Sequence, residues 1–170
     1  MDEFVSDIET DFPMSVVTGN LGDDHNIEFR LGYLIQTEQV VLMGVALIEG
    51  ASFLPAYDGV FDLRFGIRLQ YIGKPWNMTA MDFTQGTKRR YIHPNHRETV
   101  RNLTSQAIVG LVREVQPRVI TMSSYDVELP PPALVKYGVI AECLNGVGYG
   151  TVSEYRCAKG HDRWHFAAAT

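Results

Sequence analysis

The chain has few cysteines and no long apolar run. Among its 170 residues only Cys143 and Cys157 are cysteines, and they lack the spacing of metal ligands. We therefore expect free thiols and no disulfide framework. The longest apolar stretch, Val40 to Ile48, is far too short to cross a bilayer, and no signal-peptide pattern opens the sequence. These absences favour a soluble, cytoplasmic protein without a membrane partner.

Common catalytic motifs are absent too. The sequence contains no Gly-x-Ser-x-Gly, no phosphate-binding P-loop and no Cys/His signature, which argues against the hydrolase and nucleotide-hydrolase classes that use them. The pairs His93/His96 and His161/His165 have no cysteine or carboxylate nearby at a tight ligand spacing. We therefore expect no metal site.

Positive charge is missing from the N-terminal end. Residues 1–28 hold eight acids and no Lys or Arg, whereas the other 142 residues hold 15 basic and 12 acidic groups. We predict an acidic arm over residues 1–27 and a single domain over 28–170. Residues 2–12 have apolar positions at helical spacing. This short helix would pack on its own domain, dock on a basic partner or cover the protein's own basic strip. The overall charge of −5 argues against nucleic-acid binding.

The first half of the chain predicts strands. The ranges 28–36 and 39–49 form an apolar hairpin, and 60–72 alternates apolar and charged residues with a period of two. Residues 81–93 continue this pattern and predict another strand, broken near Gly86.

The second half predicts helices between strands. Asn95 and Glu98 have capping-box spacing at the start of an apolar stripe, which predicts a helix from Asn95 to Val115. Residues 130–132 open a second helix of about 131–145. A short strand, 118–123, lies between them, and a hairpin of 150–157 and 163–168 ends the chain.

Two motifs in this half resemble the GNAT superfamily of acyl-CoA N-acyltransferases. His93-Pro94-Asn95-His96-Arg97 resembles the segment after the family's fourth strand, and Ala133 to Tyr137 resembles its late helix. The resemblance covers about residues 88–157. It implies an α+β fold with a mixed, mostly antiparallel sheet, and acetyl-CoA as cofactor. The cofactor-binding positions would be those of the loop and the preceding strand: Tyr91, His93, Arg97, Val100 and Asn102.

The loop departs from the family where small residues are needed. Val100 stands at the position of the first glycine and Asn102 at that of the second small residue. Side chains there would push the pyrophosphate of coenzyme A away from the backbone N–H groups, and Glu98 adds a like charge. The loop is therefore predicted to be degenerate, with no cofactor bound.

Other residues have roles only under particular hypotheses. Tyr137 matches the family's general acid, although its place on a buried helix stripe also suits a core tyrosine. Asp82, His93 or Glu128 would be the general base, and the sequence does not select among them. A basic strip formed by Lys88, Arg89, Arg90, His96 and Arg101, next to His93 and Arg97, is the predicted partner-binding surface.

Two functions from different classes follow. The first is a GNAT-like scaffold without catalysis that serves as a protein-binding, assembly or inhibitor module, such as a virus- or phage-encoded accessory protein. The alternative is an N-acyltransferase that moves an acetyl group from acetyl-CoA to an amine. It would hold pantetheine on a splayed strand at 91–93 and use Tyr137 as acid.

Overall fold

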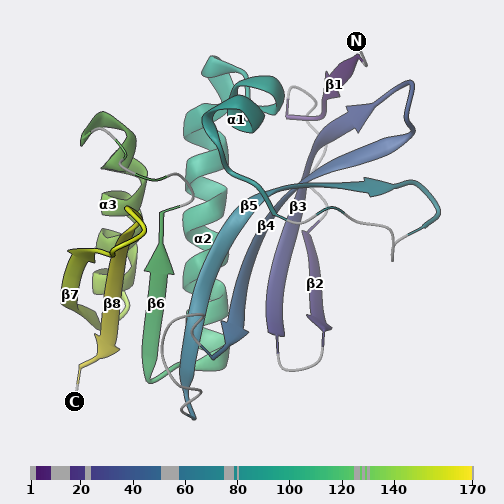
Figure 1. Cartoon of the computed structure of the whole chain (residues 1–170). Coiled ribbons are helices and arrows are strands. Elements are labelled where there is room, and N and C mark those ends of the chain that lie inside the picture. Colours follow the sequence, from purple (N-terminus) through teal and green to yellow (C-terminus); the bar gives the residue numbers. More distant parts are fainter. Residues whose placement is uncertain are drawn as a thin grey trace.

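The fold is a single mixed sheet with its long helices on one side (Figure 1). The computed structural model describes residues 3–8, 16–21, 24–50, 58–74, 79, 81–124, 127, 129 and 131–169. Its elements, in chain order, are β1 (Phe4–Ser6), β2 (Val16–Leu21), β3 (Asp24–Leu34), β4 (Gln39–Glu49), β5 (Val60–Tyr71), α1 (Gln85–Tyr91), the 3-10 turn η1 (Pro94–His96), α2 (Arg97–Val115), β6 (Val119–Ser123), α3 (Pro131–Gly146), β7 (Tyr149–Arg156) and β8 (Asp162–Ala168).

The sheet has the strand order β1-β3-β4-β5-β6-β8-β7, and β2 pairs with β3 beside this path. Every pair is antiparallel except β5 with β6, which are parallel. A parallel pair needs a long crossover, and α2 lies within it. The predicted α+β class, the two long helices and the C-terminal hairpin are confirmed.

The alternation of side chains decides which face of the sheet carries the core. In β4 and β5 the odd-numbered residues, such as Met43, Phe65 and Ile67, join one buried cluster with the inner stripe of α2. Even-numbered positions on β5 carry Asp62, Arg64 and Arg68, as the period of two predicts. Helices α2 and α3 contact one another and lie on the same face, behind the sheet in Figure 1.

The predicted strand over residues 81–93 is wrong. Only Asp82 makes a β-bridge, and Gln85–Tyr91 is the helix α1. The Thr84 side chain accepts a hydrogen bond from the Thr87 N–H and so caps this helix. Gly86 and Thr87 have low helix propensity, so the sequence pattern did not predict this helix.

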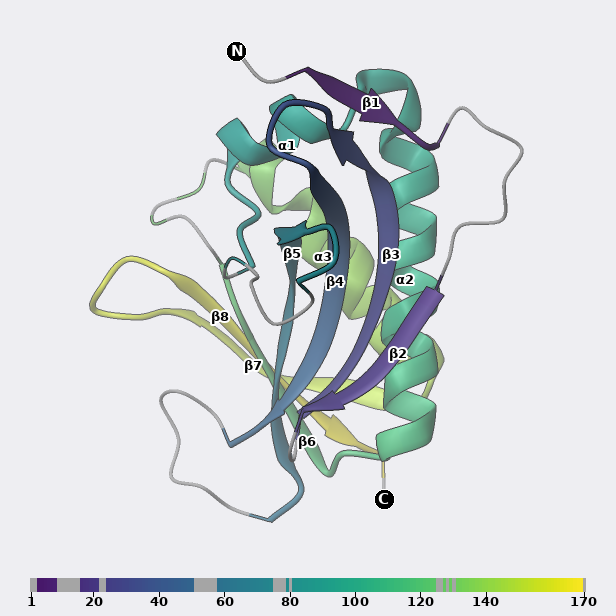
Figure 2. The same cartoon turned by 90° about the vertical axis from the view of Figure 1, so that its right-hand side faces the viewer.

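The predicted N-terminal helix over residues 2–12 is also wrong within its described part. Phe4–Ser6 is a strand that pairs with Leu34–Gly32 of β3. The free edge of β3 offers hydrogen bonds that an isolated short helix could not match. Figure 2 shows β1 at the same end of the molecule as α1, where the Phe4 ring packs edge-on against Tyr91 at 5.4 Å.

The predicted boundary between arm and domain at residues 27 and 28 falls inside β3. β2 and β3 pair as far as Leu21 with Asp24. The described N-terminal residues therefore belong to the sheet, because their backbone completes its ladder. Within the described residues, no helix has the length and apolar character needed to cross a membrane.

Candidate functional site

The parallel strands β5 and β6 separate after a short pairing. Their register covers only Val60 to Asp62 on β5 and Val119 to Thr121 on β6. β5 then continues to Tyr71, and Figure 1 shows the two strands diverging towards α1. The strand that splays is therefore β5. The predicted splayed strand at 91–93 is wrong, because Tyr91 ends helix α1.

The edge of β5 left by this divergence is covered by the chain itself. We call Thr79 together with residues 81–84 the strap. The N–H of Ile67 donates to the Asp82 carbonyl at 2.8 Å, and the N–H of Asp82 returns a bond to Ile67 at 2.9 Å. Further along, the Thr79 N–H donates to the Leu69 carbonyl at 3.0 Å, and the Thr79 hydroxyl accepts from the Leu69 N–H at 2.9 Å. An extended ligand would have to displace these four bonds.

A glycine in β5 allows the strap to lie this close. A Cβ atom on Gly66 would stand 3.0 Å from both the Asp82 nitrogen and the Met81 Cβ. Met81 also reaches across to Gly44 on β4, where an added Cβ would lie 2.9 Å from its terminal methyl. A glycine inside an alternating strand often marks close backbone approach, so Gly66 was the sequence signal for the strap.

Phe83 of the strap fills the space beneath the diverging strands. It is 9% exposed and packs edge-on against Phe65 with ring centroids 5.4 Å apart. The Lys136 ammonium of α3 lies over its ring at 4.6 Å, a cation–π contact. Spacing along the chain does not predict this contact, because the meeting of Phe83 and Lys136 depends on how α3 docks on the sheet.

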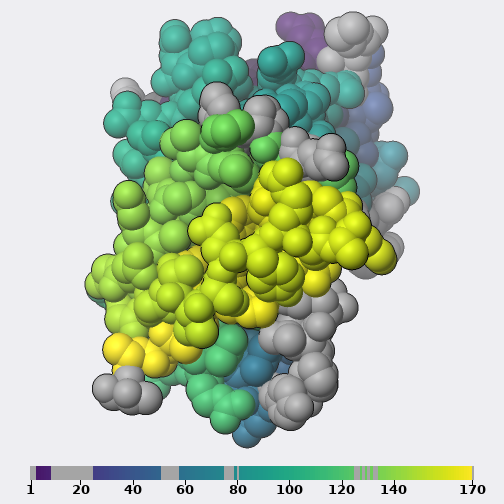
Figure 3. All heavy atoms as spheres, turned by 60° about the vertical axis from the view of Figure 1, so that its left-hand side comes forward, coloured from purple at the N-terminus to yellow at the C-terminus, as the bar shows by residue number. Residues whose placement is uncertain are grey.

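Tyr137, the predicted general acid, lies in the core. Its side chain is fully buried and stacks on Trp164 of β8, with centroids 4.7 Å apart and planes 13° from parallel. The Phe65 ring lies 6.0 Å away on the sheet side. The residue thus joins α3 to the C-terminal hairpin through aromatic packing. Figure 3 shows the hairpin lying against α3 on this side of the molecule.

The link between α1 and α2 uses its own N–H groups. Pro94 has none, and the Asn95 N–H donates to the His93 ring at 3.3 Å. The His96 N–H donates to the His93 carbonyl at 2.9 Å, and the Arg97 N–H to the Pro94 carbonyl. The predicted Asn95–Glu98 capping box is not formed, because the 3-10 turn makes His96 the N-cap of α2. A helix N-terminus closed in this way offers no open cradle to an anion at residues 94–97.

Beside the strap lies an open groove of about 460 Å³. Its walls are α1, the first three turns of α2 and the middle of α3, and its floor is apolar, with Phe83, Ile92, Val100 and Ile140. Four cationic side chains line it: Lys88, Arg97, Arg101 and Lys136.

The structure therefore brings four predicted site residues to the groove, namely Lys88, Arg97, Val100 and Arg101. Val100 is 3% exposed in the groove floor. Tyr91, His93 and Asn102 are not among the described residues that line it: Tyr91 is buried, and the other two are exposed.

The remaining basic residues of the predicted strip lie on α1 and in the link between α1 and α2. Arg89 and Arg90 are exposed on α1, and the Arg90 guanidinium lies over the Tyr91 ring at 5.2 Å. The rings of His93 and His96 meet edge-on at 5.8 Å. The residues of the predicted basic strip thus lie on α1, in the link and on the first turns of α2.

Of the candidate bases, Asp82 is committed to local structure. Its carboxylate accepts hydrogen bonds from the Thr84 N–H at 2.8 Å and from the hydroxyls of Thr84 and Thr87. Burial alone would raise the pKa of Asp82, but these hydrogen bonds outweigh it and hold the pKa below its usual value. His93 is exposed, and Glu128 lies outside the described residues. No group of three potential metal ligands occurs in the part of the chain that the structure describes.

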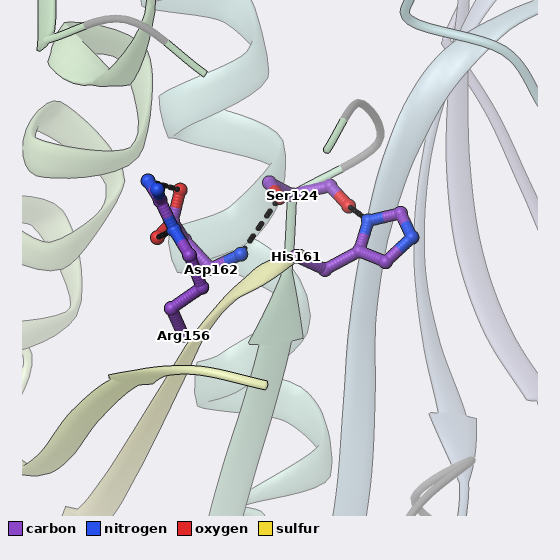
Figure 4. Close-up of polar contacts among 4 residues, drawn as sticks. All are labelled: Ser124, Arg156, His161 and Asp162. Carbon is purple, nitrogen blue, oxygen red and sulfur yellow. Dashed lines mark hydrogen bonds and ion pairs between the residues drawn. The ribbon is translucent and has the colours of Figure 1, made fainter. Parts of the chain in front are cut away.

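A serine, a histidine and an aspartate meet where β6 ends against the β7–β8 hairpin (Figure 4). The Ser124 hydroxyl accepts from the backbone N–H of Asp162 at 3.0 Å, and the His161 ring contacts the Ser124 carbonyl oxygen at 2.8 Å. The Asp162 carboxylate binds Arg156 at 3.0 and 3.3 Å. His161 contacts the carbonyl oxygen of Ser124, whereas the Ser124 hydroxyl binds the backbone of Asp162. The three residues therefore hold β6 to the hairpin and do not have the geometry of a nucleophilic triad.

Comparison with known proteins adds little beyond the fold. No protein-family model and no curated protein matches the chain. It is similar to a solved structure, a chimera of the spermidine N-acetyltransferase SpeG from Vibrio cholerae and hSSAT, with 14% identity and a TM-score of 0.43. The match covers 86% of this chain and 66% of that one. Likeness at this level assigns no chemistry.

Proposed function

We propose that this chain is a protein-binding module on a GNAT-like scaffold and does not transfer acyl groups. It would serve as an assembly or inhibitor component, such as a virus- or phage-encoded accessory protein. One observation carries the proposal: the strap occupies the edge of β5 that β6 leaves. The family resemblance implies that pantetheine would bind at such a splayed strand.

Two further observations support it. The N–H groups of residues 95–97 already make hydrogen bonds within the link, so these three donors are not available to a pyrophosphate. Tyr137 is buried against Trp164, so its phenol has no route to a departing thiolate. Both observations argue against acyl-CoA binding and acyl transfer of the kind that the family performs.

The basic strip is the surface proposed for the partner. Arg89, Arg90, Arg97 and Arg101 are exposed at one end of the molecule, where an acidic protein face would be attracted. In the described part of the N-terminal arm, Asp7 pairs with Arg30 on β3.

A thermal-shift titration with millimolar acetyl-CoA tests the proposal. The melting temperature is expected to stay unchanged. A ligand at 100 times its dissociation constant would add about 2.7 kcal/mol to the free energy of unfolding, which is easily seen. A clear shift that disappears in Arg97→Ala would instead establish the alternative, an N-acyltransferase that uses acetyl-CoA.

A further inference from the structure

The groove between α1, α2 and α3 has the charge and shape to hold part of a partner protein. Resting on the proposed function, we infer that its occupant is an amphipathic helix with an apolar stripe and acidic residues along its flanks. Three observations lead to this inference: cationic side chains line the groove, part of its apolar wall is exposed, and the edge of β5 is already paired with the strap.

The rim of the groove favours negative charge. Lys88, Arg97, Arg101 and Lys136 line it, and the one lining acid among the described residues is Glu98. Glu98 is 79% exposed and lies 3.9 Å from Arg101, and it offsets one of the four positive charges that line the groove. An acidic flank would therefore meet a net positive surface.

The wall formed by α3 leaves apolar surface exposed. Val135 lines the groove and is 61% exposed, although it lies on a helix whose other face is buried. Below it, Val100 and Ile140 form a continuous apolar floor. An occupant with an apolar stripe would bury Val135 and extend this floor, which is the usual source of affinity when a helix lies in a groove.

The strap decides that the occupant is helical and not extended. An extended peptide gains affinity by adding to a free strand edge, and Ile67 and Leu69 already use theirs to bind Asp82 and Thr79. A helix satisfies its own backbone and needs no such edge. A small phosphate ligand fits less well, because the N–H groups of residues 95–97 are already hydrogen-bonded within the link. Arg97 and Arg101 are solvent-exposed, where an ion pair contributes little.

A synthetic peptide tests this with the full-length chain. The probe is a fluorescein-labelled helix of about 15 residues, with leucine at helical spacing and glutamate on both sides. Fluorescence anisotropy measures its dissociation constant. Val135→Asp is expected to weaken binding about tenfold, by placing a like charge against the probe at a position that is already exposed. Val152→Asp, at a 68% exposed valine on β7, is the matched control and is expected to have no effect.

A second pair of variants tests the charge. Arg101→Glu is expected to weaken binding several-fold more than Arg113→Glu, which makes the same change at the far end of α2, and the difference should shrink as salt is raised. A probe with lysine for glutamate is expected to bind at least tenfold more weakly.

Three results would overturn the inference: no binding of the probe, equal effects of Val135→Asp and Val152→Asp, or equal affinity for the lysine probe. None of them bears on acetyl-CoA. A failure here therefore leaves the proposed absence of acyl transfer standing, whereas a melting shift with acetyl-CoA would remove that proposal directly.

Discussion

Asp82 and Ile67 exchange both of their backbone hydrogen bonds, at 2.8 and 2.9 Å, on the edge of β5 that β6 has left. This antiparallel bridge turns a divergence between parallel strands into a closed sheet edge. Phe83 then follows directly into the space below. The chain thus supplies its own occupant for the opening that the fold creates.

Replacing Gly66 tests the close approach of the strap. Gly66→Ala is expected to lower the free energy of unfolding by about 1–3 kcal/mol, because its Cβ would meet backbone atoms of Asp82 that cannot rotate away. Gly138→Ala is the control: it lies on α3 with nothing within 4 Å, and it is expected to stabilise by about 0.5–1 kcal/mol. Urea denaturation measures both, and equal effects would contradict the described contact.

Asp82 itself should anchor the strap in a pH-dependent way. Asp82→Ala removes a carboxylate that accepts from Thr84 and Thr87, at an expected cost of about 1–2 kcal/mol. Because the folded pKa of Asp82 is lowered, its contribution is present above the unfolded pKa of about 3.9 and is lost as pH falls through the folded value. Asp58→Ala, at an exposed turn position, is the control. A difference between the two variants that stayed constant from neutral pH through the whole acid range would contradict this role.

The ion pair between Glu28 and Arg68 crosses β4 on the other face of the sheet. Both side chains are largely buried, at 9% and 11% exposed. Arg68→Met is expected to lower the free energy of unfolding by about 3–5 kcal/mol, because it leaves the buried Glu28 carboxylate without its cation. Adding Glu28→Gln should recover much of this loss.

This ion pair also has an expected pH signature. Burial raises the pKa of Glu28, and the Arg68 charge only partly offsets that rise. Without Arg68 the pKa of Glu28 should rise further. The folded state would then be favoured by protonation, and its stability would fall as pH rises through the folded pKa. Arg68→Met is thus expected to be more damaging at about pH 8 than at about pH 5, and the reverse order in denaturation curves would contradict the description.

Because Tyr137 stacks on Trp164, we expect its substitution to destabilise the fold. The N-acyltransferase hypothesis instead predicts a loss of catalysis. Tyr137→Leu is expected to destabilise the fold by about 2–4 kcal/mol and to change the fluorescence of Trp164. Tyr155→Leu, at a 41% exposed tyrosine on β7, should do neither. Equal stability of the two variants would place Tyr137 outside the core.

Much of the architecture could be predicted because periodicity reports burial directly. The hairpin of β3 and β4, the alternation along β5 and the stripe of α2 each repeat one chemical pattern over several turns or pleats. The patterns of the later elements also predicted the helices near 95–115 and 131–145, the strand between them and the C-terminal hairpin.

The failures lie where a short segment takes its conformation from distant neighbours. Residues 85–91 have low helix propensity at Gly86 and Thr87, but the Thr84 cap starts the helix α1 directly after the single bridge at Asp82. Phe4 to Ser6 has helical spacing within its acidic arm, but the edge of β3 imposes a strand. The groove likewise depends on how α3 docks, so Lys136 and Phe83 could not be placed by spacing along the chain.

Amide hydrogen exchange at Ile67, Leu69 and Asp82 tests the closed edge of β5 most directly. We expect slow exchange at all three N–H groups, with rates unchanged when millimolar acetyl-CoA is added, because each donates to a strap or strand partner. Rapid exchange at these amides in the free protein, or a change confined to them on adding acetyl-CoA, would show that this edge is open to ligand and would rule out the closed edge.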